Sequence, residues 1–248
     1  MPPRVYRPAY DELTRAYLAQ ATILVDALAA ADPGAPTRVP DWTVGAMITH
    51  LVRGLSVLQN SPQTGGRATL DVERWAASIG GNAAVIDEHA RAADLTIADL
   101  RTRLEQNRTL VASLAADDVL TTKRGPMRAD DVIVTRCIEV TLHALDLVEP
   151  PQLDPACARI VARVLLDVLE RRHPGRSVEV RVPPYGAVQC LEGPTHTRGT
   201  PPNTVECDGV TWLLLAGGRL SWADAVDAGR VRPSGIRADL APVLPLLS

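Results

Sequence analysis

Two side chains that can bind a metal ion, Glu139 and His143, stand four positions apart in the segment RCIEVTLHALDLV. In a helix, this spacing places both side chains on one face, about one turn apart. Arg136 and Asp146 fall on the same face, while most other positions of the segment are Val, Ile, Leu or Ala. Polar groups on an apolar helix need partners that offset their desolvation. The segment therefore predicts a polar stripe that is buried and partnered.

A third candidate ligand, His50, lies within AMITHLV and has apolar residues on both sides. Two histidines and one glutamate from facing helices leave one open position on a tetrahedral Zn²⁺, which is the arrangement of a catalytic rather than a structural site. Asp146, or a backbone carbonyl, would then orient a histidine ring nitrogen, and Arg136 is expected to lie next to the ligands without binding the ion. Spacing alone leaves a second interpretation open, in which His50 is a satisfied core residue and Glu139 and His143 lie on a solvated helix face.

The elements that must position these residues are helical as far as Pro150. Apolar residues recur there at helical spacing between segments rich in Gly, Pro and Thr. We expect Thr43 to cap the second helix, the third to span the Gly80-Gly81 pair, and Asp130 or Asp131 to cap the fifth. The expected helices cover residues 10–32, 44–59, 71–91, 96–114 and 130–148, with a loop at 121–129. Short connections favour antiparallel neighbours, so residues 1–150 predict an all-α bundle of four or five helices.

The pattern changes after Pro150-Pro151, because proline disfavours helix at the residue before it. We expect residues 151–248 to form a second, smaller α+β domain that begins with a helix at about 154–172. Strands are expected at 177–182, 185–193, 204–209 and 231–235, a polar turn at 195–203, and helices at 210–218, 221–229 and 236–244.

Composition excludes several classes of protein. The formal net charge of the 248 residues is −3, without the basic excess that nucleic-acid-binding proteins carry. The chain contains no apolar run of about 18 residues and no signal-peptide pattern at its start, so we expect a cytoplasmic protein that does not contact membranes. The four cysteines, Cys137, Cys157, Cys190 and Cys207, are widely spaced and form no CxxC pair. These four cysteines are expected to be reduced and mostly buried.

Two stretches, PDWTVGAMITHLVRG and RCIEVTLHALDLV, resemble the N-terminal helical domain of the mycothiol-dependent maleylpyruvate isomerase family, a DinB-like bundle. In that family a Trp-Ser/Thr turn precedes the helix with a metal-binding histidine, and a later helix supplies Glu-xxx-His. The resemblance covers most of residues 8–150. It implies that His50, Glu139 and His143 are the metal ligands, and it makes the metal interpretation the favoured one.

The C-terminal stretch, CDGVTWLLLAGGRLSWADAVDAGRVRPSGIRADLAPVLPLL, looks like the sterol-carrier-protein-like domain of actinobacterial proteins with the same two-part layout. It is not an obvious copy of the C-terminal domain of the authentic isomerase, and this departure leaves the substrate open.

The resemblance to the isomerase family implies a divalent metal, with zinc favoured, and mycothiol as a thiol cosubstrate. A metal-bound thiol loses its proton at neutral pH, and its sulfur can attack a small electrophile. The implied activity is isomerisation or S-transfer, in a monomer or a homodimer. Arginines would bind substrate carboxylates by bidentate pairing. The candidates among the 25 arginines are Arg53, Arg136, Arg219, Arg230 and Arg237.

Two other functions remain open at this point. The first is a lipid or sterol carrier, in which the C-terminal domain holds an apolar ligand and the bundle is a scaffold. A carrier needs a continuous apolar cavity, but a domain of about one hundred residues needs its apolar residues for its own core. These residues are Trp212, Leu213, Leu214, Leu215 and Trp222. The second is a redox or stress-response interaction module that has kept the bundle and lost turnover.

Overall fold

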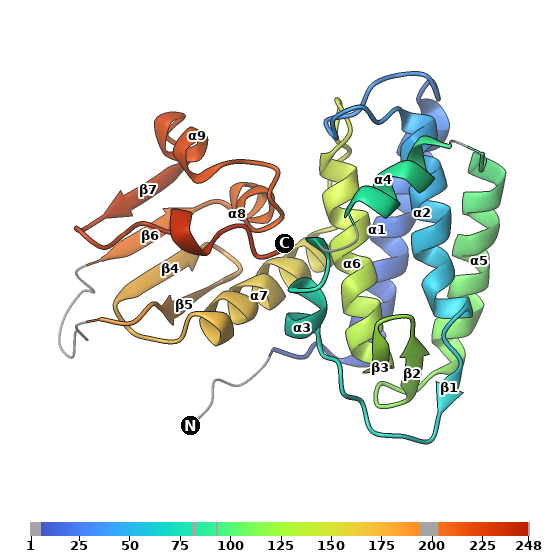
Figure 1. The fold of residues 1–248 in the computed structure, drawn as a ribbon, viewed down its shortest axis with the longest axis horizontal. Coiled ribbons are helices and arrows are strands. Elements are labelled where there is room, and N and C mark those ends of the chain that lie inside the picture. Colours follow the sequence, from blue (N-terminus) through green and yellow to red (C-terminus); the bar gives the residue numbers. More distant parts are fainter. Residues whose placement is uncertain (1–5, 81–82, 93, 194–202, 248) are drawn as a thin grey trace. The chain divides into compact units, whose positions relative to one another are not determined.

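The structure is a computed structural model that describes residues 6–80, 83–92, 94–193 and 203–247 (Figure 1). The chain divides into two units, one made of Pro8–Ala158 and the other of Arg159–Ser248 with the N-terminal residues Tyr6 and Arg7. The first unit is mainly helical and the second is α+β, which confirms the predicted fold class.

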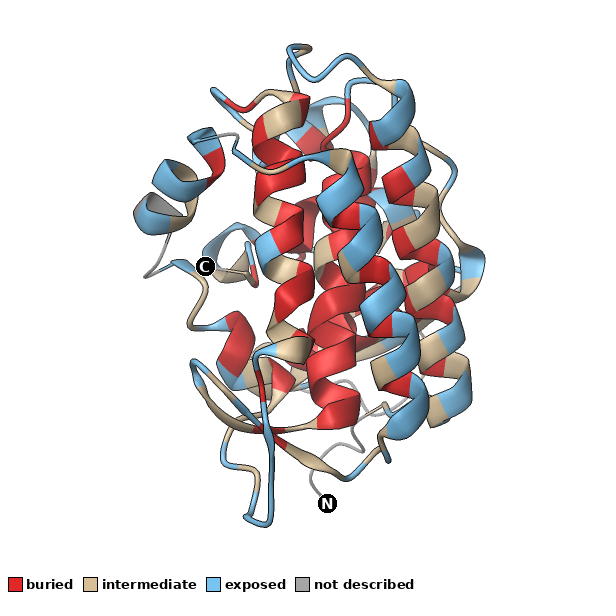
Figure 2. Cartoon of the chain, turned by 90° about the vertical axis from the view of Figure 1, so that its right-hand side faces the viewer, coloured by how far each residue is buried: buried red, intermediate tan, exposed pale blue. Residues whose placement is uncertain are grey.

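Four long helices form the bundle of the first unit. They are α1 (Tyr10–Ala30), α2 (Val44–Gln59), α5 (Ile97–Ser113) and α6 (Ala129–Leu145). Helix α1 packs against α5 and α6, and α2 packs against the same two helices. Figure 2 shows that buried residues lie mainly on the sides that the helices turn toward one another. The bundle therefore encloses one apolar core, to which each fully buried Leu or Met side chain contributes about 1.5–3 kcal/mol.

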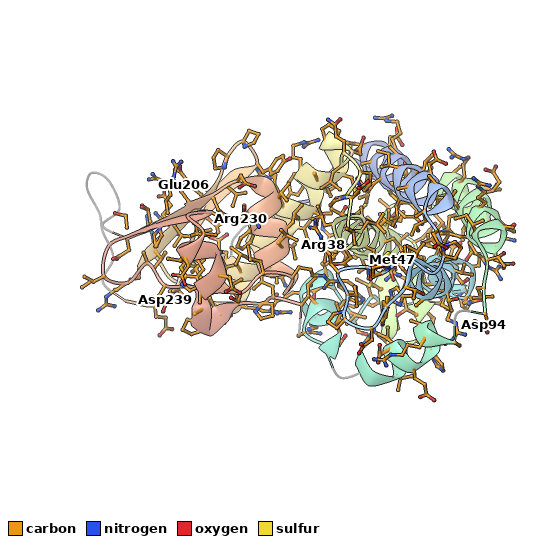
Figure 3. The ribbon with its side chains drawn as sticks, turned by 90° about the horizontal axis from the view of Figure 1, so that it is seen from above. Arg38, Met47, Asp94, Glu206, Arg230 and Asp239 are labelled. Carbon is orange, nitrogen blue, oxygen red and sulfur yellow. The ribbon has the colours of Figure 1, made fainter. Side chains whose placement is uncertain are left out.

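Helix α2 carries His50 and begins where the sequence predicts. The hydroxyl of Thr43 accepts a hydrogen bond from the backbone N–H of Ala46 at 3.2 Å, which confirms Thr43 as the N-cap. Met47, Leu51 and Leu55 are almost completely buried. Met47 lies among the helices of the bundle, as Figure 3 shows. These apolar residues fix the rotation of α2, and thereby the direction in which His50 points.

Helix α6, which carries Glu139 and His143, is buried at nearly every position. A helix that is buried all round belongs to the centre of a fold. Its expected cap was wrong, because the helix begins at Ala129 after Arg128, and Asp130 and Asp131 lie in its first turn. The negative charges of both aspartates still interact favourably with the positive N-terminal end of the helix dipole. The helix ends at Leu145, a few residues earlier than expected.

Two other predictions for this unit were wrong. The expected helix over 71–91 is two helices, α3 (Val72–Ala76) and α4 (Ala83–Arg91), separated by a segment that includes Gly80. Glycine disfavours helix, and here it contributes to a break instead of a kink. Gly81 lies outside the described residues. The expected loop at 121–129 contributes to a hairpin of β2 (Val119–Thr122) and β3 (Gly125–Arg128), onto which β1 (Gln63–Thr64) adds as an edge strand. The hairpin turn ends at Gly125, whose φ of 132° favours glycine.

The second unit is built on a four-stranded sheet in the order β5-β4-β6-β7. Its strands are β4 (Val178–Val182), β5 (Gly186–Cys190), β6 (Thr204–Cys207) and β7 (Val231–Ser234). Only the pair β4 and β6 is parallel among the described strands. The helices of this unit are α8 (Gly209–Ala216), α9 (Trp222–Asp227) and, from Arg159 onward, α7 (Pro155–Arg172). Trp212 of α8 is fully buried and its indole N–H donates to the carbonyl of Ala162 in α7.

The sequence placed most of these elements correctly, with one error and one untested segment. The expected helix over 236–244 is only the short 3₁₀ turn η2 (Ala241–Val243). In a helix over 236–244, Pro242 would be an interior residue, where it lacks the N–H for the i−4 hydrogen bond and its ring clashes with the preceding turn; in the first turn of η2 it is tolerated. The expected polar turn at 195–203 lies outside the described residues apart from Asn203. Between α6 and α7, residues 146–154 contain neither helix nor strand. The domain boundary at 150/151 stays a prediction.

All four cysteines are free and buried, as expected. None of the described helices is both long enough and apolar enough to cross a bilayer.

Replacing Thr43 by alanine removes the acceptor that caps α2, so we expect Thr43→Ala to lower the free energy of unfolding by about 1 kcal/mol. Urea denaturation monitored by circular dichroism measures the change. Thr43→Ser keeps the acceptor oxygen, so its loss of unfolding free energy should be less than about half of the loss in Thr43→Ala. An equal loss in both variants would contradict the capping role.

Candidate metal site

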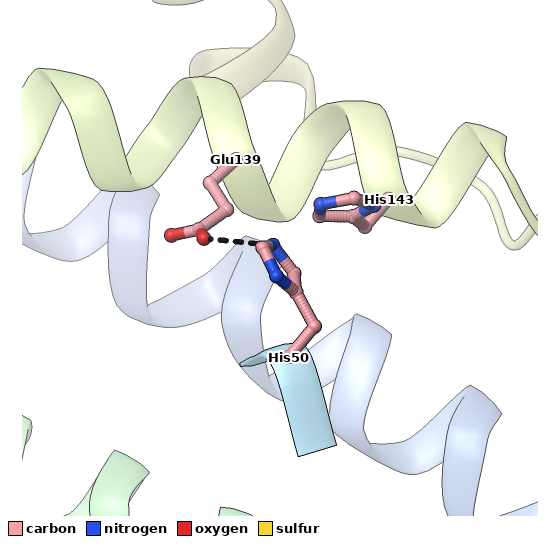
Figure 4. Close-up of side chains that lie close together, drawn as sticks. All are labelled: His50, Glu139 and His143. Atoms are coloured by element: carbon pink, nitrogen blue, oxygen red, sulfur yellow. Dashed lines mark ion pairs between the residues drawn. The ribbon is translucent and has the colours of Figure 1, made fainter. Parts of the chain in front are cut away.

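The structure brings His50, Glu139 and His143 together inside the bundle. One ligand atom from each residue lies within 4.8 Å of the other two. Nε2 of His50, on α2, is 3.2 Å from Oε1 of Glu139, on α6. His143, one turn further along α6, directs a ring nitrogen toward the same point (Figure 4). Ligands bound to one zinc ion at 2.0–2.2 Å lie at most about 4 Å apart, so side-chain shifts of about 1 Å suffice to close the site.

All three side chains are largely shielded from solvent, with exposed fractions of 16% for His50, 12% for Glu139 and 10% for His143. Two imidazole nitrogens and one carboxylate oxygen are ligand types that suit zinc and related divalent metals. No other group of three or more such side chains occurs among the residues that the structure describes. The donor set therefore fits a divalent metal ion, and the role of these residues as ligands stays a prediction.

Asp146 orients His143. Nδ1 of His143 lies 2.9 Å from Oδ2 of Asp146, whose side chain is 1% exposed. A carboxylate accepts a hydrogen bond and cannot donate one when ionised, so the proton of a neutral His143 ring lies on Nδ1. The nitrogen left for a metal is then Nε2. This is the carboxylate–histidine pairing that commonly accompanies metal ligands.

Arg136 holds the other oxygen of Glu139. Its Nη1 donates to Oε2 of Glu139 and, at 2.9 Å, to the carbonyl oxygen of Gly54 on α2. Burial alone would raise the pKa of Glu139, but the charge of Arg136 and the hydrogen bond with His50 outweigh it and lower the pKa to about 2. Glu139 is therefore ionised at neutral pH, as a metal ligand must be.

Trp42 forms a wall beside both histidines. Its ring centroid is 5.1 Å from that of His50 and 6.1 Å from that of His143, to which it is nearly parallel. Its indole N–H donates to Oδ1 of Asp87 on α4 at 2.7 Å. The family motif contains this tryptophan, but the sequence alone predicted neither its contact with the two histidines nor its hydrogen bond with Asp87. An aromatic residue directly before the cap of the histidine helix was the available signal.

The candidate substrate arginines are divided between the two units. Arg53 lies on α2, one turn after His50, and its Nη2 is 3.4 Å from Oδ1 of Asp94. Both of these side chains are substantially exposed. Arg136 donates hydrogen bonds to Glu139 and to the carbonyl oxygen of Gly54. Arg219, Arg230 and Arg237 belong to the second unit, where Nε of Arg230 donates to Thr211 at 3.3 Å. Their roles in substrate binding stay predictions.

The apolar residues considered for a lipid cavity lie mostly in the core of their own unit. Trp212, Leu213, Leu214 and Leu215 are buried, and Trp222 is half-buried. Their packing fits the expectation that the second unit uses them for stability.

The lowered pKa of Glu139 predicts the acid stability of the metal-free protein. A carboxylate whose pKa is lower in the folded than in the unfolded state stabilises the fold above its ordinary pKa, and this stabilisation is lost as the pH falls toward the folded value. In the presence of a chelator, the wild type should lose about 2 kcal/mol more than Glu139→Gln between about pH 5 and pH 3. Urea denaturation across this range measures the difference. Parallel curves would show that Arg136 and His50 do not stabilise the ionised carboxylate.

Two family models match the chain, one over each part. The model described as the mycothiol maleylpyruvate isomerase N-terminal domain matches residues 14–148, and the model described as a bacterial SCP ortholog matches residues 155–246. Both matches confirm the resemblance found in the sequence. No curated protein matches the chain.

Solved structures show the same fold. The crystal structure of the mycothiol-dependent maleylpyruvate isomerase matches with a TM-score of 0.60 at 16% identity, covering 92% of this chain and 93% of that one. A mutant of that isomerase, with a histidine replaced by alanine, matches with the same TM-score at 15% identity and the same coverage. The N-terminal model spans more than half of the chain and includes His50, Glu139 and His143. The chain therefore belongs to the family of the mycothiol maleylpyruvate isomerase N-terminal domain.

Proposed function

We propose that this chain is a metal-dependent enzyme that uses a low-molecular-weight thiol, mycothiol, to isomerise or S-conjugate a small electrophilic substrate. The observation that carries the proposal is the cluster of His50, Glu139 and His143 inside the bundle of this family. Buried ionisable groups that share one point are characteristic of functional sites. The solved isomerase with the same fold supports the use of mycothiol and the comparison with maleylpyruvate.

Each residue of the cluster would have a separate role in binding the cation or in orienting a ligand. His50, Glu139 and His143 hold a divalent cation, and zinc suits three protein ligands with one position left for an exogenous group. A bound cation supplies the charge that keeps a coordinated thiol ionised at neutral pH. Asp146 holds the proton of His143 on Nδ1. Arg136 holds Oε2 of Glu139 and leaves Oε1 for the cation.

Arg53 is the candidate in the bundle for binding a substrate carboxylate. It lies one turn after His50 on the same helix, and its side chain is 39% exposed. Its partner Asp94 is 57% exposed, and an ion pair this open contributes little to stability. A substrate carboxylate can replace Asp94 and gain a bidentate pair with the guanidinium.

The amount of thiol consumed per substrate molecule distinguishes isomerisation from S-transfer. In isomerisation, the sulfur adds to a cis double bond, the resulting single bond rotates, and elimination forms the trans double bond and returns the thiol. In S-transfer, a carbon–sulfur bond forms and remains, so one thiol is consumed for each electrophile. Incubating the zinc-loaded protein with mycothiol and maleylpyruvate, and following both by mass spectrometry, distinguishes the two. If neither the trans isomer nor a thioether forms with maleylpyruvate or other small electrophiles, the proposed activity is wrong.

Removing either ligand of α6 should abolish metal binding. We expect His143→Ala and Glu139→Ala each to lose stoichiometric zinc and thiol-dependent turnover while the helical circular dichroism persists, because the apolar faces hold the bundle together. Metal analysis, melting temperature and turnover are measured on the same samples.

The matched controls for these ligand variants are His89→Ala on α4 and Glu105→Ala on α5, which remove exposed side chains of the same kinds elsewhere in the first unit. Both controls should keep zinc and activity. Full zinc content in the ligand variants, or a wild type that binds no divalent metal, would contradict the proposal and favour the lipid-carrier function.

Asp146→Asn tests the orientation of His143. An amide can donate as well as accept, so the proton of His143 is no longer restricted to Nδ1. We expect zinc affinity to fall about 10- to 100-fold, the usual effect of removing a partner of a metal ligand. Competition with a chromophoric chelator measures this affinity. Asp130→Asn, at another buried aspartate of α6, is the control for a general loss of stability and should leave zinc affinity unchanged.

A further inference from the structure

Gly54 faces Glu139 from the neighbouring helix. It lies on α2 one turn after His50, and a Cβ atom at this position would come 2.7 Å from Cδ and 2.8 Å from Oε2 of Glu139, and closer still to Oε1. Carbon atoms do not approach carboxylate atoms so closely in folded proteins, so a side chain at position 54 would have to displace the carboxylate. The space that the glycine leaves is the space that the Glu139 carboxylate fills.

The backbone of Gly54 contributes a second contact. Its carbonyl oxygen accepts a hydrogen bond from Nη1 of Arg136 at 2.9 Å, and the same nitrogen donates to Oε2 of Glu139. Position 54 therefore adjoins both members of the Arg136–Glu139 pair. Its carbonyl oxygen accepts a hydrogen bond from Arg136, and the absence of a side chain leaves room for the Glu139 carboxylate.

The conformation of α2 does not itself require glycine here. Gly54 lies inside a regular helix and is not among the residues with positive φ. Glycine in a helix interior is less favourable than alanine, because it loses more backbone entropy on folding. Its presence at this position needs another reason, and the contact with Glu139 supplies one.

We infer that Gly54 is a positioning residue of the metal site, which lets the Glu139 carboxylate pack against α2 with Oε2 on Arg136 and Oε1 toward His50. Because Arg136 occupies Oε2, Glu139 offers the cation one oxygen instead of two. The expected effect of Gly54 on metal affinity rests on the proposed metal site. Its expected effect on the packing of Glu139 rests only on the geometry of position 54.

Gly54→Ala should act mainly on the carboxylate. The atoms that the new Cβ meets are at the end of a flexible side chain, so Glu139 moves while the two helices stay in place. We expect the affinity for zinc, and for Co²⁺ as a spectroscopic probe, to fall about 10- to 100-fold. The absorption spectrum of the cobalt form should change, because the carboxylate no longer binds in its original position.

A matched control is available in the same helix. In Gly45→Ala, the atoms nearest to the new Cβ would be the carbonyl oxygen of Pro33 at 3.3 Å, Oγ1 of Thr43 at 3.6 Å and Cβ of Pro33 at 3.8 Å, none of which belongs to the metal site. This variant should keep the zinc and cobalt affinities and the cobalt spectrum of the wild type. A comparable loss of affinity in Gly45→Ala would show that any alanine in α2 disturbs the site, and would overturn the inference.

A double-mutant cycle separates positioning from packing. In a Glu139→Ala background the carboxylate is absent, so Gly54→Ala should raise the melting temperature of the metal-free protein through the helix propensity of alanine. In the wild-type background the same substitution should be clearly less favourable. An equal change in both backgrounds, or an unchanged zinc affinity in Gly54→Ala, overturns the inference.

The two parts of the experiment also separate this inference from the proposed function. If the wild type binds neither zinc nor Co²⁺, the proposed function fails, while the melting temperatures of the metal-free variants still decide whether Gly54 accommodates Glu139. If the wild type binds metal and the cycle shows no coupling, the proposed function stands and the inference about Gly54 fails.

Discussion

The burial of charge on α6 is the constraint on which the bundle depends. An isolated ion among apolar helices is strongly unfavourable, so each buried charge needs a partner with good geometry. Here the partners are arranged in two local pairs, each three residues apart: Arg136 with Glu139 on α6, and His143 of α6 with Asp146, the residue that caps its end. Because α6 and its cap supply both pairs, the neighbouring helices complete the site and exclude water.

Completion of the site comes mainly from α2 and the turn before it. Gly54 has no side chain, and the Glu139 carboxylate occupies the space next to it. His50 brings the second imidazole nitrogen to within 3.2 Å of the same carboxylate. Trp42 covers both imidazoles and is held by Asp87 of α4. Packing and hydrogen bonds therefore hold the three proposed ligands close to one another without a cation, which is the preorganisation that the proposed metal site would need.

Two of the prediction errors concern short elements, and a third concerns the start of α6. The hairpin of β2 and β3 has four residues in each strand, too few for an alternating pattern to stand out beside Pro126 and Gly125. The helix expected at 236–244 reduces to a 3₁₀ turn because Pro242 blocks its extension. Asp130 or Asp131 was expected to cap α6 because of its side chain, but the helix begins at Ala129. The first backbone N–H groups of the helix, those of Ala129 and Asp130, donate instead to the carbonyl oxygens of Asp118 and Ala116.

By itself, the sequence determined the long helices, the change to an α+β pattern after Pro150 and the polar stripe of α6, because periodicity and i, i+4 spacing are local properties of the chain. It also identified His50, Glu139 and His143 as the candidate ligands. Only the tertiary structure decided which groups meet across helices: His50 with Glu139, Trp42 with both histidines, and Gly54 with the carboxylate. These contacts depend on the rotation and separation of packed helices, which are set by the interlocking of many apolar side chains and not by the spacing of any one segment.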